Sequence, residues 1–320
     1  MKQTIKRWRD NSPLMEPLCR LLRATGMVPA RLWHHLPFTG TADFLVAGTR
    51  VKMNHFGAEI ENSLFWAGFG ADWEGTTLLA WERLAIGQKV IFDVGANTGL
   101  FAVAAKAASP QAMVHAFEPL PAIADRLRAN VALNGFDVTV HAAAVSDSDG
   151  TAEIKLMQAD HEYSASFEHM DWMDTAEAIS IEVPVIRLAS VIADSGHRPD
   201  LIKIDVERHE PQALRGLWPA IADGPMPAMV IEILDDECAA AVAAEVADRG
   251  YRSYVIREGV GIEADTIRFV PGTMNWLLLP EGMSGPAGEL AAQLAAKGRI
   301  SHAELAGSRP RSHSQPRNSN

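Results

Sequence analysis

The sequence predicts an α/β protein whose mostly parallel sheet is covered by helices on both faces. Three observations point to this class. Apolar runs of strand length alternate with helical patterns along most of the chain. A glycine-rich turn at residues 93–99 joins one such run to a helix. Nearly half of the 320 residues (48%) are apolar, which is enough for a large packed core.

The first 45 residues predict a basic, helical N-terminal extension. Four leucines recur at helical spacing between arginines and lysines; they are Leu14, Leu18, Leu21 and Leu22. This helix could pack on its own domain, cover the mouth of a site, form a homodimer contact or touch an anionic membrane surface.

Residues 46–282 are expected to form the main α/β domain. Its predicted strands are residues 90–92, 113–117, 138–141, 201–205, 229–234 and, running antiparallel, 274–279. Its predicted helices are residues 78–85, 101–105, 123–131 and 239–247. The first of these helices has a natural stop at Gly87.

Between about residues 151 and 187 the apolar pattern changes to strict alternation, which predicts a β-hairpin or cap insertion. A long polar and aromatic loop with His161 and Tyr163 lies inside it and is a candidate for substrate specificity. Residues 283–320 are rich in Ala, Ser, Arg and Pro, so we expect a disordered tail.

Composition excludes several classes of protein. A net charge of −11 disfavours nucleic-acid binding, which needs a basic surface. The sequence has no run of eighteen apolar residues and no signal-like start, so a cytoplasmic protein without a transmembrane segment is expected. Cys19 and Cys238 are far apart, which supports neither a disulfide framework nor a zinc site. Both are expected to fill packing positions.

The segment that follows the strand at 90–92 is expected to be a cofactor loop. Gly95 allows a left-handed turn close to a ligand, and Gly99 allows the next helix to pack tightly on the sheet. The candidate cofactor-binding residues here are Asp93, Gly95, Ala96, Asn97, Thr98 and Gly99.

The loop does not match a dinucleotide site. That motif needs glycines where Asn97 and Leu100 stand, so that a pyrophosphate can approach the helix. S-adenosylmethionine has no phosphate, and it carries a sulfonium and an ammonium against one carboxylate, which suits an acidic cleft. Glu118 and Pro119 follow the next strand, about nineteen residues after Gly99, where a carboxylate can hold both ribose hydroxyls. We therefore expect S-adenosyl-L-methionine as the cofactor.

Acidic residues gather after two later strands, at the edge of the sheet where ligands bind. The candidate catalytic residues are Asp205, Glu207, His209, Glu210 and Glu232. Clustered carboxylates raise one another's pKa and can take a proton from a hydroxyl nucleophile. The structural alternative is that Glu210 begins a helix and Asp205 anchors a loop. Carboxylates are also ligands for divalent metals, but no spacing here demands one.

Residues 93–99 and the run Ile202-Lys203-Ile204-Asp205-Val206-Glu207-Arg208-His209-Glu210 resemble the FkbM family of S-adenosylmethionine-dependent methyltransferases. Members of this family show D-V-G-A-N-x-G and K-I-D-V-E-G-x-E at these places. The resemblance extends from about Trp73 to Leu279, roughly two thirds of the chain. It implies a class I, Rossmann-like methyltransferase sheet and, usually, O-methylation of a hydroxyl on a sugar, glycan or natural product.

Two positions depart from the family pattern. Arg208 replaces a glycine, and Leu188-Ala189-Ser190 replaces Leu-Asp-Asp, which loses a carboxylate. If that family acid caps a helix or turn, Ser190 can partly replace it. If it touches substrate, a different acceptor is expected. Two other functions stay open. An NAD-type oxidoreductase is disfavoured by the missing glycines, and a catalytically silent cofactor-binding or scaffold protein is disfavoured by Asp205 and Glu207.

Overall fold

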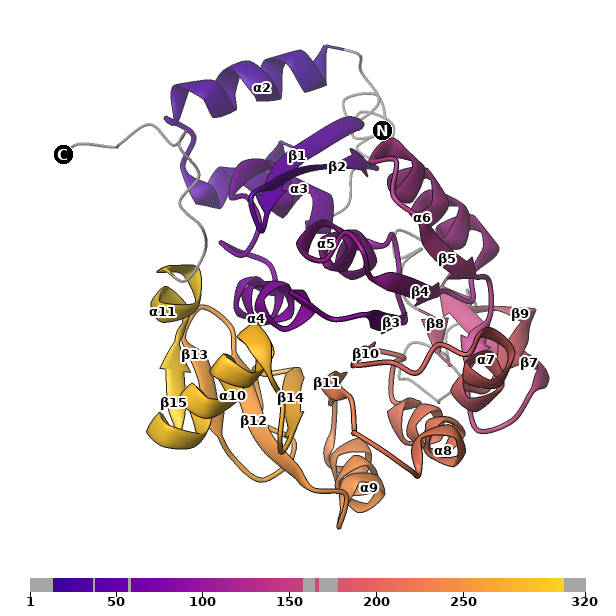
Figure 1. Ribbon diagram of the computed structural model, residues 1–320. Coiled ribbons are helices and arrows are strands. Elements are labelled where there is room, and N and C mark those ends of the chain that lie inside the picture. Colours follow the sequence, from indigo (N-terminus) through magenta and orange to yellow (C-terminus); the bar gives the residue numbers. More distant parts are fainter. Residues whose placement is uncertain (1–13, 37, 57–58, 158–164, 167–177, 308–320) are drawn as a thin grey trace.

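The structure is a computed structural model that describes residues 14–36, 38–56, 59–157, 165–166 and 178–307. At its centre lies a nine-stranded sheet with the order β15-β13-β12-β14-β11-β10-β3-β4-β5 (Figure 1). Its strands are β3 (Val90–Val94), β4 (Met113–Phe117), β5 (Val138–His141), β10 (Leu201–Ile204), β11 (Ala228–Glu232), β12 (Tyr251–Arg257), β13 (Gly261–Ala264), β14 (Asn275–Pro280) and β15 (Arg299–Ser301). The strands from β5 to β11 are parallel, and β14 pairs antiparallel with β11.

This arrangement confirms the predicted parallel core and antiparallel late strand. The antiparallel ladder goes further than predicted, because β12, β13 and β15 extend it to the sheet edge. The chain turns outward in opposite directions from β3 and from its neighbour β10, which makes this pair the switch point of the sheet. In open α/β sheets the ligand crevice lies beyond the carboxyl ends of such a pair.

Helices cover both faces of the sheet. The helices of the main fold are α4 (Gly75–Ala85), α5 (Leu100–Ala108), α6 (Pro121–Leu133), α7 (Leu188–Ser195), α8 (Glu210–Ile221), α9 (Asp236–Val246) and α10 (Gly285–Lys297). The core that contains α4, α5 and α10 takes Ile91 from β3, whereas the core with α7, α8 and α9 takes Phe92. Successive strand residues therefore enter opposite cores, as the near-continuous apolar runs predict.

A second, four-stranded sheet stands beside the main one, with the order β6-β9-β7-β8. Its strands are β6 (Ala144–Val145), β7 (Gly150–Met157), β8 (Ala165–Ser166) and β9 (Ala178–Ile186). The antiparallel pairing of β7 with β9 confirms the predicted insertion. His161 and Tyr163, the loop residues proposed for specificity, lie outside the described residues.

The N-terminal region is joined to the main fold. It contains α2 (Met15–Thr25), the 3-10 helix η1 (Ala30–His35), the hairpin strands β1 (Gly40–Val46) and β2 (Thr49–His55), and α3 (Glu59–Trp66). β1 crosses the predicted boundary at residue 45, and hairpin residues such as Val46 and Val51 enter the same core as α5. Cys19 of α2 is buried, whereas Leu14, Leu18 and Leu21 are exposed.

The prediction of a disordered tail from residue 283 is wrong for residues 285–307. This segment forms α10, β15 and α11 (His302–Gly307). It has few large apolar side chains, but they are spaced to share one buried surface: Leu290, Leu294, Ile300 and Leu305. Ala287 and Ala291 of α10 also enter the core that contains α4, so composition underestimated the apolar surface that becomes buried.

Candidate active site

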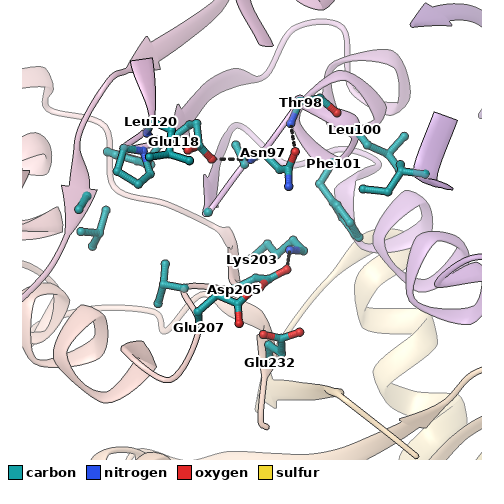
Figure 2. Close-up of a pocket in the computed structure, with 18 of the residues that line it drawn as sticks. Asn97, Thr98, Leu100, Phe101, Glu118, Leu120, Lys203, Asp205, Glu207 and Glu232 are labelled. Atoms are coloured by element: carbon teal, nitrogen blue, oxygen red, sulfur yellow. Dashed lines mark hydrogen bonds and ion pairs between the residues drawn. The ribbon is translucent and has the colours of Figure 1, made fainter. Parts of the chain in front are cut away.

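A cavity of about 260 Å³ opens at the switch point between β3 and β10. It is lined by the glycine loop, by the ends of β4, β10 and β11, and by the segment before α4 (Figure 2). The predicted site residues in its wall are Gly95, Ala96, Asn97, Thr98, Glu118, Pro119, Asp205, Glu207 and Glu232. Segments far apart in the sequence therefore meet at one cavity.

The glycine loop has the geometry of a ligand cradle. Gly95 has a φ of +79°, and a Cβ there would lie 1.7 Å from the carbonyl oxygen of Asp205, so only glycine lets β3 and β10 end this close together. Gly99 has a φ of +90° and caps α5. A Cβ at Gly99 would lie 2.9 Å from Leu127, so this glycine permits close packing against α6 rather than against the sheet.

Glu118 connects the loop to the end of β4. Its carboxylate accepts hydrogen bonds from the N–H of Asn97 (3.0 Å) and the N–H of Leu120 (2.9 Å) (Figure 2). Burial raises the pKa of Glu118 to about 7, against the effect of these two bonds. A carboxylate has about four acceptor positions, so Glu118 can still accept from ribose hydroxyls.

A buried charge cluster lies at the centre of the cavity. Lys203 Nζ donates to Asp205 Oδ2 at 2.5 Å, and it lies 4.5 Å from the ring centroid of Phe101. Burial lowers the pKa of Lys203, but the carboxylates of Asp205, Glu74 and Asp93 outweigh burial and raise it. Asp93 itself is fully buried behind the wall, and burial raises its pKa to about 6. Lys203 therefore stays charged and holds the acids of β3 and β10 in place.

The loop after β10 carries Glu207 into the cavity wall. Glu207 and Arg208 have φ values of +54° and +74°, a left-handed conformation that side chains with a Cβ adopt at a cost. The glycine that the family has at position 208 adopts this conformation readily. In this chain the Arg208 guanidinium instead pairs with Asp235 at 2.8 Å, at the start of α9.

Glu232 ends β11 on the same sheet edge. It is 7% exposed, and its Oε2 atom has no hydrogen-bond partner among the described residues. Burial, together with Asp205, Glu207 and Glu210, raises the pKa of Glu232 well above its usual range. This shift favours the protonated form of its carboxyl group.

Two predicted residues support the loop from behind the cavity wall. Glu210 begins α8, and its carboxylate accepts from the N–H of Val206 (3.0 Å) and from the thiol of Cys238 (3.1 Å). His209 is buried and lies 2.9 Å from Ser146 Oγ. Neither residue lines the cavity, and Glu210 begins a helix as the structural alternative states.

The departure at Ala189 and Ser190 lies outside the cavity wall. Ser190 Oγ donates to Asp149 Oδ2 at 2.8 Å, and the N–H of Arg187 donates to the other oxygen of Asp149 at 2.7 Å. These bonds lower the pKa of Asp149, the Arg187 N–H bond most. Asp149 therefore provides a carboxylate at the start of α7.

Sequence reasoning missed two charged residues in the wall, Lys203 and Glu74. Lys203 could be predicted from the sequence, because a lysine inside the buried run Leu201–Ile204 must have an acidic partner. Glu74 precedes α4, and only the aromatic and glycine-rich composition of the loop around it could indicate a site residue there.

Two kinds of feature are absent from the part of the chain that the structure describes. No group of three or more His, Cys, Asp or Glu side chains there is arranged to hold a metal ion. No helix there is long and apolar enough to cross a membrane. Cys19 and Cys238 are both buried, and neither forms a disulfide.

Comparison with known proteins identifies the family. The family model described as the methyltransferase FkbM domain matches residues 93–253. The 31-O-demethyl-FK506 methyltransferase FkbM of Streptomyces tacrolimicus is 36% identical over 163 residues, which cover 41% of this chain and 62% of that protein. Methyltransferase sdnD of Sordaria araneosa is 32% identical over 154 residues, 40% of this chain and 60% of that protein. The matches thus span less than two thirds of these relatives.

Among solved structures, a SAM-dependent methyltransferase from Agrobacterium tumefaciens is similar with a TM-score of 0.45 and 13% identity, covering 79% of this chain and 80% of that one. The parallel order β5-β4-β3-β10-β11 followed by antiparallel β14 is the class I methyltransferase sheet that the family resemblance implies. With the family model matching from Asp93 in the cofactor loop to Ser253, this chain belongs to the FkbM family of S-adenosylmethionine-dependent methyltransferases.

Proposed function

We propose that this protein transfers a methyl group from S-adenosylmethionine to a hydroxyl oxygen of a small-molecule or glycan acceptor. One observation carries the proposal. The glycine loop with Glu118 and the acids Asp205, Glu207 and Glu232 line a single cavity. A cofactor site and an acidic cluster that can receive a proton are thereby adjacent.

The residues of the cavity fit this cofactor better than a dinucleotide. The N–H of Asn97 already donates to Glu118, so a phosphate at the loop would face a carboxylate instead of a free donor. Two buried carboxyl oxygens that line the cavity, Glu74 Oε2 and Glu232 Oε2, have no hydrogen-bond partner within the described ranges. Such oxygens favour a ligand that is cationic or rich in N–H and O–H donors.

When bound, the cofactor supplies an electrophilic methyl group on a sulfonium sulfur that leaves as a thioether. The chain's own residues orient the acceptor and take its proton. Lys203 holds the Asp205 carboxylate toward the centre of the cavity, where it can accept a hydrogen bond from the acceptor hydroxyl. We propose that Glu207, which lines the cavity on the adjoining loop, receives the proton as the new carbon–oxygen bond forms. Glu232 is less suited to be the base, because burial and the neighbouring acids raise its pKa and favour its protonated form.

The choice of oxygen as the acceptor atom draws on the relatives. The name of the Streptomyces protein describes methylation of 31-O-demethyl-FK506, which is an O-methylation. Clustered carboxylates suit a hydroxyl nucleophile, since it needs a proton acceptor in the transition state.

Calorimetric titration with S-adenosylhomocysteine and, separately, with NAD tests the cofactor. We expect S-adenosylhomocysteine to bind and to raise the melting temperature, while NAD does neither. The reverse ranking would support the oxidoreductase alternative. Screening hydroxylated metabolites and glycans with a radiolabelled methyl donor then tests the reaction. Cofactor binding without transfer to any acceptor would favour the silent scaffold.

A further inference from the structure

The cavity has two ends that differ in chemistry. Glu118 and Leu120 lie at one end, Phe101 lies at the other, and Lys203 with Asp205 lies between them (Figure 2). Under the proposed function, Glu118 holds the ribose, so the amino-acid portion of the cofactor extends toward Phe101. Glu74 faces Lys203 and lines the same cavity, from the start of α4.

Glu74 is a buried acid without an evident structural task. It is 7% exposed, and its Oε2 atom has no hydrogen-bond partner among the residues described. It does not cap α4, because the N–H groups of Thr76 and Thr77 donate to Glu258 instead, at 2.7 and 3.3 Å. A buried carboxylate oxygen without a donor destabilises the fold, so a bound ligand is the natural partner.

The groups around Glu74 indicate which partner is missing. It faces Lys203, Asp205, Glu258 and Asn275, so three of its four polar neighbours are ionisable and two of these are acids. Lys203 is the cation in this group, and it is already hydrogen bonded to Asp205. Burial raises the pKa of Glu74 to about 7, and a second cation beside it would favour its ionised form.

We propose that Glu74 binds the α-ammonium group of the cofactor's methionine portion. This assignment rests on the proposed function. The α-ammonium group brings a positive charge and three N–H donors to the part of the cavity where Lys203 lies against Phe101 and where Glu74 lacks a donor. Glu74 lies outside residues 93–253, the range of the family model, so the site extends beyond the matched domain.

Calorimetry with two ligands tests the proposal without an acceptor. S-adenosylhomocysteine carries the α-ammonium group, whereas 5′-methylthioadenosine keeps the nucleoside and lacks the amino acid. Glu74→Gln should weaken binding of S-adenosylhomocysteine by about ten- to a hundredfold, the usual effect of losing one charge-assisted hydrogen bond. Binding of 5′-methylthioadenosine should change by less than about threefold, which also shows that the variant is folded.

Asp72→Asn is the matched control, because Asp72 is an exposed acid of the same loop. It should bind both ligands like the parent. The proposal is wrong if Glu74→Gln binds S-adenosylhomocysteine like the parent, or if it loses both ligands equally. If the parent itself binds neither ligand, the proposed function fails instead.

Discussion

Lys203 Nζ lies 2.5 Å from Asp205 Oδ2, which joins the buried interior of β10 to the first residue beyond the strand. A lysine at this depth is stable only because several carboxylates surround it. The pair therefore fixes the direction of the Asp205 carboxylate at the switch point. The loop that follows, with Glu207, begins from a rigid base.

Replacing Glu207 separates catalysis from cofactor binding. Glu207→Gln keeps the shape of the side chain and removes its charge, so we expect methyl transfer to fall by about a hundredfold or more if Glu207 receives the proton. Affinity for S-adenosylhomocysteine should stay within a few-fold of the parent. Glu237→Gln, on the exposed face of α9, is the control and should transfer at the parent rate. Parental turnover of Glu207→Gln would move the base to Asp205.

Replacing Glu118 should weaken binding of the cofactor directly. Its carboxylate holds the loop N–H of Asn97 and is proposed to hold the ribose hydroxyls. Glu118→Ala should cost about 1.5–3 kcal/mol of binding free energy for S-adenosylhomocysteine and, unlike Glu74→Gln, a similar amount for 5′-methylthioadenosine. Calorimetry measures both values. Unchanged affinity for the two ligands would remove Glu118 from the site.

Arg208 can be exchanged for the family's glycine with little effect on stability. Arg208→Gly relieves a left-handed conformation that costs about 1–2 kcal/mol, and it loses a partly exposed ion pair with Asp235 worth at most about 1 kcal/mol. We expect the free energy of unfolding to change by less than about 1 kcal/mol. Arg208→Val should lose more, because a β-branched residue resists a positive φ. This account is wrong if denaturant unfolding shows that Arg208→Val is more stable than Arg208→Gly.

The C-terminal segment should stabilise the fold. A chain ending at Ser284 loses the burial of Leu290, Leu294, Ile300 and Leu305, each worth roughly 1.5–3 kcal/mol before the cost of ordering the segment. We expect a clear drop in melting temperature. A chain ending at Gly307 keeps these residues and serves as the control. Equal melting temperatures for the two truncations would show that the segment contributes nothing.

Glu61 should make stability depend on pH. It is a fully buried acid of α3 whose Oε1 accepts from Thr98 Oγ1 at 3.3 Å, and burial raises its pKa from 4.5 to about 7. Between these values the folded state binds more protons than the unfolded state, so stability from the protonated form is lost as pH rises through this window. Glu61→Gln removes the effect. The melting temperature of the variant relative to the parent should therefore be higher at pH 8 than at pH 5.

Other titrating groups affect the parent and the variant alike. His55, whose pKa burial lowers to about 4, loses its neutral form on acidification in both proteins, so it cancels in the difference. A difference in melting temperature that does not change with pH would show that Glu61 titrates near its ordinary value.

Departures from the family pattern were visible in the sequence, but their consequences were not. Arg208 stands at a glycine position of the family, and its φ of +74° shows why a glycine is common there. The carboxylate missing at Ala189 is also visible in the sequence. Asp149, which lies some forty residues earlier, provides one at the start of α7 through pairing of β7 with β9.

The sequence by itself determined the features that depend on local periodicity: the buried strands, the glycine loop, Glu118 at the end of β4 and the acids after β10. Apolar period and glycine conformation are properties of a few neighbouring residues, so a short window contains the necessary information. The tertiary structure alone decided that Glu74 joins the cavity, that Glu210 and His209 support it from behind, and that residues 285–307 pack on α4. These outcomes depend on which distant segments bury surface together, and that is settled by the packing of the whole chain.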